Sequence, residues 1–157
     1  VPFKHLSDPE KTRFIHNRSG RFESRLATVE ILPSPAILLD GMAGSRLGVW
    51  VAHGEGRLHV PEPTLMEQIL EQGLAPLRFV NADNQPTTQY PLNPNGSPEG
   101  ITAICSPDGR HLAMMPHPER LSNQMWQWPW IPKSWASLRA SPWLRMFQNA
   151  HSWCIGG

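Results

Sequence analysis

The run Leu47-Gly-Val-Trp-Val-Ala52 constrains the fold of this chain more than any other segment. Its residues are almost all apolar, which is typical of a strand covered on both faces, because a half-exposed strand alternates apolar with polar residues. The run leads directly into His53-Gly-Glu-Gly56, and open α/β sheets bind their ligands just beyond the carboxyl ends of strands. The segment therefore predicts a layered α/β sheet with a candidate binding turn at residues 53–56.

The rest of the chain predicts short elements joined by tight turns. Seventeen prolines and twelve glycines among 157 residues exceed ordinary usage, and both residue types favour turns. The segments 81–86 and 106–109 have the composition of hairpin turns. Apolar and β-branched runs predict further strands at 21–32, 77–80, 87–90, 101–105 and 111–115.

Two segments predict helices. The segment 64–72 has Thr64 in the N-cap position, Glu67 three residues later as its partner in a capping box, and Gly73 as its stop. The segment 141–152 has Pro142 at the first helical position. With so few helices beside the strands, we expect a three-layer α/β unit centred on a mixed sheet, with a nearby β-rich excursion.

The composition argues against several classes of function. A net charge of +1 predicts no nucleic-acid footprint and no acidic partner. The two cysteines have no paired spacing, and most histidines have no ligand spacing with Asp, Glu or Cys, so neither a disulfide nor a metal site is expected. No segment has the roughly 18 uninterrupted apolar residues that cross a membrane, and the first residues lack the order of a signal peptide. We expect a globular, cytoplasmic protein without a nucleic-acid or membrane partner. The histidines without ligand spacing are His5, His16, His59, His111 and His151.

The segment Met115-Pro-His-Pro-Glu-Arg120 places a histidine and a glutamate two residues apart. Residues i and i+2 of an extended chain point the same way, and each proline favours extended backbone at the residue before it. We therefore expect His117 and Glu119 to lie side by side, with the carboxylate orienting the imidazole through one ring nitrogen. The other nitrogen is then free as a general base for a nucleophile. A surface turn at the end of a strand is the alternative interpretation.

Five blocks of the sequence together resemble one known family. They are Asn17-Arg-Ser-Gly-Arg-Phe-Glu-Ser-Arg25, His53-Gly-Glu-Gly-Arg57, Asn93-Pro-Asn-Gly-Ser-Pro-Glu-Gly-Ile101, Met114-Met-Pro-His-Pro-Glu-Arg120 and Ser141-Pro-Trp-Leu-Arg-Met-Phe-Gln-Asn-Ala150. The middle three, in this order and spacing, resemble the glutaminase domain of phosphoribosylformylglycinamidine synthase, a class I glutamine amidotransferase of purine biosynthesis, and the first and last resemble it too. The resemblance runs from about Phe14 to Ala150. It implies a flavodoxin-like three-layer α/β fold with a mixed central sheet, incomplete at the N-terminus.

The resemblance implies an ATP-dependent carbon–nitrogen ligase that takes its nitrogen from glutamine. In such an enzyme a cysteine thiolate attacks the glutamine amide, His117 would shuttle protons, and Glu119 would hold the imidazole. The released ammonia passes to a distant synthetase site of the same polypeptide, where ATP activates formylglycinamide ribonucleotide for amidination. ATP and Mg²⁺ therefore belong to the synthetase domains, and no cofactor is expected in residues 1–157.

The turn that follows the first predicted buried strand is expected to form part of the glutamine pocket. Its two glycines let the backbone approach a ligand and offer N–H groups to a carboxylate. By resemblance, His53, Gly54 and Glu55 help to bind the α-amino and α-carboxylate groups of glutamine.

Two further segments are expected near the substrate. Asn17, Ser19 and Phe22 lie on the side that receives the glutamine amide, although a cap at the start of a strand explains them equally well. The turn-rich loop 93–98 lies near the active site in the family, where its role is either functional or purely structural.

One part of the family pattern is missing. Family members carry the nucleophilic cysteine in a Gly-rich motif on a strand-to-helix turn, upstream of the segment that begins at Asn17, and this sequence begins at Val1. Cys105 follows a β-branched run, as a buried and unreactive strand cysteine does. Cys154 lies near the C-terminus, where chains are usually loosely ordered. We therefore expect residues 1–157 to be the C-terminal part of a glutaminase domain, inactive by itself toward glutamine.

The block 141–150 resembles the ending of the large, single-chain type of synthase, which we therefore expect. The alternatives are the small stand-alone amidotransferase subunit and a non-catalytic module that binds glutamine or forms an interface. The missing first strands predict an uncovered sheet edge and an apolar face. The Trp- and Pro-rich segment 124–143 is expected to be a loop that packs its own aromatic side chains, with no cofactor box.

Overall fold

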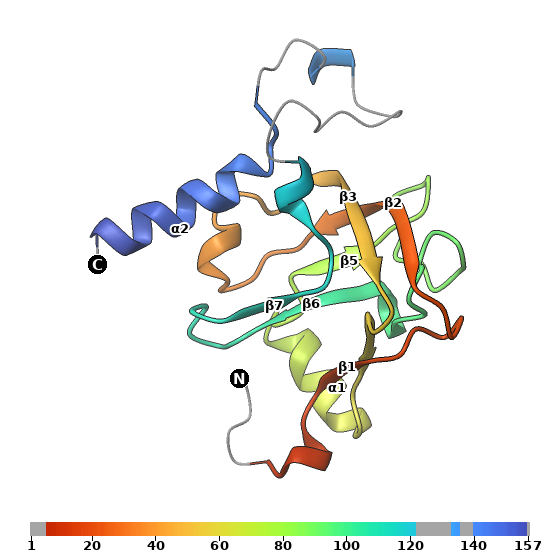
Figure 1. The fold of residues 1–157 in the computed structure, drawn as a ribbon. Coiled ribbons are helices and arrows are strands. Elements are labelled where there is room, and N and C mark those ends of the chain that lie inside the picture. The colour runs from red at the N-terminus through yellow and green to blue at the C-terminus, as the bar shows by residue number, and fades with distance from the viewer. Residues whose placement is uncertain (1–5, 122–132, 136–139, 157) are drawn as a thin grey trace.

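The computed structural model describes residues 6–121, 133–135 and 140–156 (Figure 1). Its strands form a five-stranded sheet in the order β3-β2-β5-β6-β7 and a separate two-stranded sheet, β1-β4. Every strand pair in these ranges is antiparallel, so the parallel strands of a mixed sheet do not occur in the described part of the chain. The strands are β1 (Arg13–Ile15), β2 (Glu23–Ile31), β3 (Arg46–His53), β4 (Arg57–His59), β5 (Leu77–Phe79), β6 (Ile101–Cys105) and β7 (Leu112–Met114).

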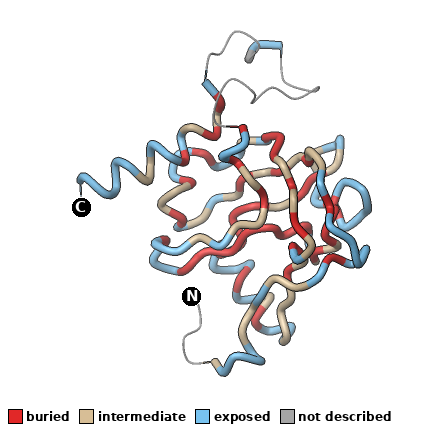
Figure 2. Tube along the Cα trace, in the orientation of Figure 1, coloured by how far each residue is buried: buried red, intermediate tan, exposed pale blue. Residues whose placement is uncertain are grey.

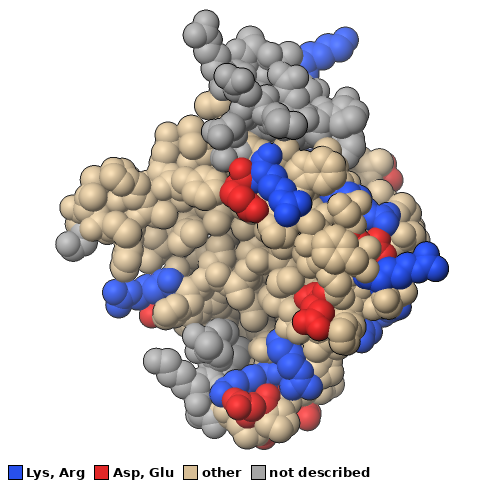
Figure 3. All heavy atoms as spheres, in the orientation of Figure 1, with Lys and Arg blue, Asp and Glu red and all other residues tan. Residues whose placement is uncertain are grey.

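Two α-helices and several 3₁₀ turns complete the described residues. In Figure 1, α1 lies below the five-stranded sheet and α2 projects from the opposite side. Basic and acidic side chains are interspersed over the face shown in Figure 3. No helix in the described ranges is long and apolar enough to cross a membrane. The helices are α1 (Pro63–Glu71) and α2 (Leu144–Gly156), and the 3₁₀ turns are η1 (Asp8–Glu10), η2 (Ile37–Leu39), η3 (Pro98–Gly100), η4 (Pro118–Leu121) and η5 (Lys133–Trp135).

The antiparallel pair β2–β3 is the frame on which the candidate site is built. Glu23 lies opposite His53 at one end of the pair, and Glu30 lies opposite Arg46 at the other. No residue of β3 after Arg46 is exposed. This burial confirms the prediction of a strand covered on both faces, and β2 confirms the long strand predicted before it.

β3 is an edge strand of the sheet, yet two of its outward carbonyls are occupied. The indole Nε1 of Trp143 donates to Gly48 O at 2.8 Å, and the backbone N of His117 donates to Trp50 O at 2.8 Å. This edge of the sheet is therefore covered at these two positions. Trp143 is fully buried, so this tryptophan packs into the core and not into a separate aromatic loop. The tryptophans at positions 126, 128 and 130 lie outside the described residues.

Helix α1 packs one apolar face against the core, but its N-terminus differs from the prediction. The N-cap is Glu62, with Pro63 in the first turn and Thr64 inside the helix, so the predicted capping box is wrong. Proline is favoured at this position because its fixed φ suits the helix and its missing N–H would have had no partner. The predicted stop is confirmed by Gly73, which has φ +65°.

Helix α2 begins later than predicted and extends further. The Ser141 hydroxyl accepts from Trp143 N at 3.2 Å, and Ser141 O accepts from Leu144 N at 2.9 Å. These bonds make a turn of the residues around Pro142, and the helix then continues to Gly156. Its second half is exposed along its whole length (Figure 2).

The hairpin predicted around residues 106–109 is confirmed as β6–β7. Ala103 lies opposite Met114, and Gly109 in the turn has φ +69°. A side chain at Gly109 would overlap the carbonyl oxygen of Pro35, so the turn also needs glycine for space.

The hairpin predicted around residues 81–86 forms only in part. Val80 and Pro86 make an isolated bridge, and Thr87 N donates to Phe79 O at 3.1 Å, but residues 87–90 form no strand. The carbonyl of Thr87 instead accepts from the Asn93 side chain at 3.0 Å. This bond draws the chain away from the sheet and into a loop of the candidate site.

Candidate functional site

His117 lies in the segment that connects β7 with η4 and passes beside β3. Its backbone N bonds Trp50 O, and the two residues form an isolated antiparallel bridge. Two residues earlier, Met115 N donates to Thr102 O in β6 at 3.2 Å. Two strands of the sheet therefore fix the backbone that carries His117.

His117 and Glu119 make the contact that the sequence predicts. Nδ1 of His117 lies 2.8 Å from Oε1 of Glu119, which is within hydrogen-bonding reach. The expected extended backbone is wrong, because Pro118 begins the 3₁₀ turn η4 and Glu119 lies in its first turn. The pair therefore meets across the start of a helical turn, where a proline loses no hydrogen bond.

The Glu119 carboxylate determines which nitrogen of His117 carries the proton. A carboxylate accepts hydrogen bonds, so a neutral imidazole donates from Nδ1 and keeps its lone pair on Nε2. The two side chains are 31% and 54% exposed, so solvent and a reactant have access to them. This is the arrangement of a general base with an orienting acid.

His53 ends β3 and supplies a second imidazole. Its ring centroid lies 6.3 Å from that of His117, and the residue is 8% exposed. Burial lowers the pKa of His53; the polar groups of Asn95 and Met115 oppose this shift, and the charge of His117 adds to it. A neutral imidazole therefore lies beside the candidate base at neutral pH.

The side chain of Asn17 fixes the turn that follows β3. Its Nδ2 donates to the carbonyls of Arg21 and His53, both at 2.8 Å. Its Oδ1 accepts from Gly56 N at 3.0 Å and from Asn95 Nδ2 at 2.7 Å. The residue is 3% exposed, and both its amide oxygen and its amide nitrogen bond the protein.

The loop from Asn93 to Ser97 closes against the same turn. Oδ1 of Asn93 accepts from the backbone N of Gly96 at 2.9 Å and of Ser97 at 3.2 Å. Ser97 Oγ in turn accepts from Leu58 N at 3.0 Å and donates to Gly56 O at 3.3 Å. Buried side chains thus join two loops that are far apart in the sequence.

We refer to Asn17, Asn93 and Asn95 as the amide cluster. Each of them is at most 3% exposed. Sequence reasoning identified Asn17 and the loop 93–98 but missed the parts played by Asn95 and Ser97. In the sequence, these two residues are marked only by the many turn-forming residues of their loop. Such a motif does not reveal that its polar side chains are buried.

Gly54 and Glu55 form the tip of the turn after β3. Gly54 O accepts from Asn17 N at 2.8 Å, and the Glu55 side chain is 64% exposed. A side chain at Gly54 would meet no atom within 4 Å, whereas one at Gly56 would overlap His53 Nε2. The tip therefore offers open space to a ligand, and the following glycine is required for packing.

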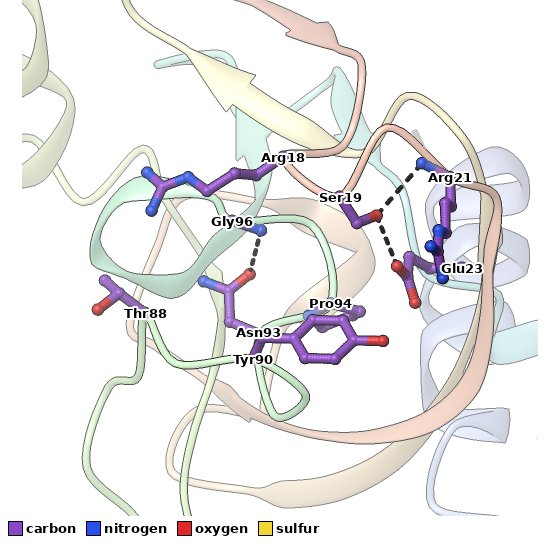
Figure 4. Close-up of a pocket in the computed structure, with 9 residues that line it drawn as sticks. All are labelled: Arg18, Ser19, Arg21, Glu23, Thr88, Tyr90, Asn93, Pro94 and Gly96. Carbon is purple, nitrogen blue, oxygen red and sulfur yellow. Dashed lines mark hydrogen bonds between the residues drawn. The ribbon is translucent and has the colours of Figure 1, made fainter.

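A cavity of about 410 Å³ opens between the segment 18–23 and the loop 88–96 (Figure 4). In its wall, Ser19 Oγ donates to Glu23 Oε1 at 2.6 Å and accepts from Arg21 N at 3.3 Å. Glu23, which sequence reasoning missed, is 3% exposed and also pairs with Arg25. Phe22 is 67% exposed and does not line the cavity. The lining residues are Arg18, Ser19, Arg21, Glu23, Thr88, Tyr90, Asn93, Pro94 and Gly96.

The two cysteines have different environments. Cys105 is buried in β6, and burial raises the pKa of its thiol to about 11. It therefore stays protonated and unreactive at neutral pH, as predicted. Cys154 is exposed and lies within α2, not in a loosely ordered end. Among the described residues, no group of three or more His, Cys, Asp or Glu side chains is arranged to hold a metal ion.

The family model of the CobB/CobQ-like glutamine amidotransferase domain matches residues 1–154 of the chain. Phosphoribosylformylglycinamidine synthase of Homo sapiens is 55% identical over 90% of the chain and 10% of that protein. The probable phosphoribosylformylglycinamidine synthase of Arabidopsis thaliana, chloroplastic/mitochondrial, is 58% identical over 93% of the chain and 10% of that protein. The chain thus spans about a tenth of the length of these relatives.

A solved structure supports the fold. PurLQS from Thermotoga maritima matches 92% of this chain and 53% of its own chain, with a TM-score of 0.59 and 20% sequence identity. At this identity the likeness concerns the fold alone, and it confirms the α/β class expected for a class I glutamine amidotransferase.

Proposed function

Because the chain belongs to the CobB/CobQ-like glutamine amidotransferase domain family, we propose that it supplies the glutaminase part of a phosphoribosylformylglycinamidine synthase. The observation that carries the proposal is the 2.8 Å contact between His117 and Glu119, in a chain 55% identical to a relative of that name. In this proposal, residues 1–157 are the C-terminal part of the glutaminase domain.

His117 is the proposed proton carrier for a cysteine that lies outside residues 1–157. His117 takes the proton of the cysteine thiol, and the thiolate bonds to the amide carbon of glutamine. The carbon–nitrogen bond breaks, and His117 delivers that proton to the departing ammonia. Water then attacks the thioester, gives a proton to His117, and releases glutamate with regeneration of the cysteine. Glu119 stays ionised and holds the imidazole in the tautomer that both steps need.

Glutamine is proposed to bind at the turn after β3. The open space at Gly54 and the exposed Glu55 carboxylate support contacts with the α-carboxylate and α-amino groups. His53 is nearly buried, so we assign it a place behind the binding surface and next to His117.

The amide side of the substrate is proposed to face the cavity of Figure 4. Ser19 in its wall supports this orientation. Asn17 is proposed to act indirectly, by holding the turn, since its amide already bonds the protein on both sides. The proposed contact of Phe22 rests on its exposure alone.

The ammonia is proposed to pass to synthetase domains of the same polypeptide, which would use ATP and Mg²⁺ to convert formylglycinamide ribonucleotide to the amidine. No cofactor is proposed for residues 1–157. The large single-chain type is favoured over a stand-alone subunit, because the chain matches only 10% of two relatives with synthase names. A non-catalytic module is disfavoured by the intact His117–Glu119 contact.

The proposal includes a cytoplasmic location and no nucleic-acid or membrane partner. The Arabidopsis thaliana relative is named chloroplastic/mitochondrial, so the compartment needs its own test. Fluorescent tagging of the complete protein in its own cells would provide it, and signal confined to an organelle would contradict this part of the proposal.

An ammonia-release assay tests the catalytic proposal. We expect no turnover of glutamine by residues 1–157, and turnover when the chain is extended upstream through the family's cysteine motif. His117→Ala should abolish the activity of the extended protein, and Cys105→Ala should leave it unchanged. Turnover by the 157-residue chain that disappears with Cys105→Ala would contradict the assignment of the nucleophile to a residue outside positions 1–157.

A further inference from the structure

Asn95 is buried beneath the candidate site, and the orientation of its amide is defined. Oδ1 of Asn17 accepts from Gly56 N, while Nδ2 of Asn17 donates to two carbonyls. The group of Asn95 that faces Asn17 Oδ1 at 2.7 Å must therefore be its NH₂. Its own Oδ1 points elsewhere, in a residue with 0% exposure.

The Asn95 amide meets the ring of His53 at one place. A methyl group built on Gly56 would overlap His53 Nε2 and lie 2.5 Å from Asn95 Nδ2. Both ring nitrogens of His53 and Oδ1 of Asn95 are buried without a hydrogen bond of good geometry to any described residue. Such groups are normally paired, so Oδ1 of Asn95, which is an acceptor, suits a protonated ring nitrogen of His53 as its partner. The backbone of Met115 is the other polar group that acts on this ring.

We propose that Asn95 is a positioning residue that holds the His53 ring against Gly56 and thereby controls the protonation of the imidazole next to His117. The functional meaning of this control rests on the role proposed above for His117. The 6.3 Å between the two ring centroids makes a charge on either ring unfavourable for the other.

The titratable groups around His53 are few. His117 faces it from the segment after β7, and Glu23 lies opposite it in β2 but already binds Ser19 and Arg25. Glu55, in the same turn, has a side chain that is 64% exposed, and its Oε1 lies 3.5 Å from Nδ1 of His16. Two uncharged groups act against the effect of burial on the pKa of His53, the Asn95 amide and the Met115 backbone. Of these, the Asn95 amide is the one that a substitution can remove.

The test is a titration of the His53 ring by NMR in the 157-residue chain. Asn95→Asp places a carboxylate of nearly the same shape beside His53, so we expect the titration midpoint to rise by about 1 pH unit or more. Asn95→Ala removes the amide without adding charge, so the midpoint should fall. The matched control is Asn93→Asp, which disturbs the same buried loop away from His53 and should move the midpoint much less.

The outcomes are distinct. A midpoint that is unmoved by both Asn95 variants, or that moves equally with Asn93→Asp, would overturn the proposal. If Asn95→Asp does not fold, the fall expected for Asn95→Ala decides. The proposed function has its own test. It fails if the protein extended through the cysteine motif releases no ammonia, even when the Asn95 variants still shift the His53 titration midpoint. If both hold, Asn95→Ala in the extended protein should reduce kcat about tenfold or more and shift its pH profile.

Discussion

The base–acid pair and the amide cluster both adjoin His53 but are built in opposite ways. His117 and Glu119 are 31% and 54% exposed and meet in one contact of 2.8 Å. The cluster of Asn17, Asn93 and Asn95 is at most 3% exposed and bonds several loops from within. The residues proposed for the chemistry are thus near the surface, and the geometry that places them is fixed by buried amides.

Because of this difference, we expect substitutions in the base–acid pair to affect activity and substitutions in the amide cluster to affect stability. An exposed ion pair is screened by water and contributes little to folding. A buried amide whose partners are removed leaves groups that have lost both water and protein hydrogen bonds. Four substitutions test the comparison, in order of the expected loss of unfolding free energy.

Asn17→Ala should have the largest effect, a loss of about 2–4 kcal/mol, because the partners of the side chain remain buried and unbonded. Urea unfolding followed by circular dichroism measures it. The matched control is Asn81→Ala, since Asn81 Oδ1 accepts from two backbone N–H groups in an exposed turn, and its loss should stay below about 1 kcal/mol. Equal losses would show that burial of the amide cluster does not matter.

Gly56→Ala should follow, with a loss of about 1–3 kcal/mol, because its methyl group would overlap the buried His53 ring. Gly54→Ala, two residues earlier, meets no atom within 4 Å and should stay within about 0.5 kcal/mol. The same unfolding experiment compares them. A destabilising Gly54→Ala with a neutral Gly56→Ala would mean that the turn is packed differently.

His53 should make stability depend on pH. Its pKa is lowered in the folded state, first of all by burial, so the unfolded chain binds a proton more readily. Its contribution is therefore present above the unfolded pKa of about 6.5 and is lost as the pH falls through the folded pKa. His53→Gln should flatten this loss in unfolding measured from pH 7.5 down to 5, and His151→Gln on the exposed part of α2 should not. An unchanged slope in His53→Gln would contradict the argument.

The sequence predicts elements well where a short-range pattern decides them. β2, β3 and the β6–β7 hairpin follow from alternation, an apolar run and a turn motif. The predicted N-cap of α1 is wrong because the helix begins at Pro63, one residue before Thr64. The strand predicted at 87–90 is wrong, and the carbonyl of Thr87 there accepts from the side chain of Asn93, six residues further along the chain. An alternation pattern does not reveal this bond from a side chain to the backbone.

The candidate site likewise combines contacts that a short motif predicts with contacts that only the folded chain reveals. The contact between His117 and Glu119 is predictable, since the two residues are neighbours in one motif, although its helical turn is not. The bond between Asn17 and Asn95 joins residues 78 positions apart. Its existence depends on the order of strands in the sheet, so the sequence marks both segments without revealing that they hold each other.

Glu119→Gln should change the unfolding free energy least, by about 0.5 kcal/mol or less, because its contact is open to water. In the protein extended through the cysteine motif, the same substitution should lower kcat by about a hundredfold or more, since an amide no longer fixes the His117 tautomer. Ammonia release and urea unfolding of this variant thus measure its effect on activity and on stability. Glu71→Gln at the end of α1 is the control for removal of a surface charge and should affect neither. A Glu119→Gln protein that keeps full activity, or that unfolds as readily as Asn17→Ala, would show that the carboxylate serves the fold and not the base.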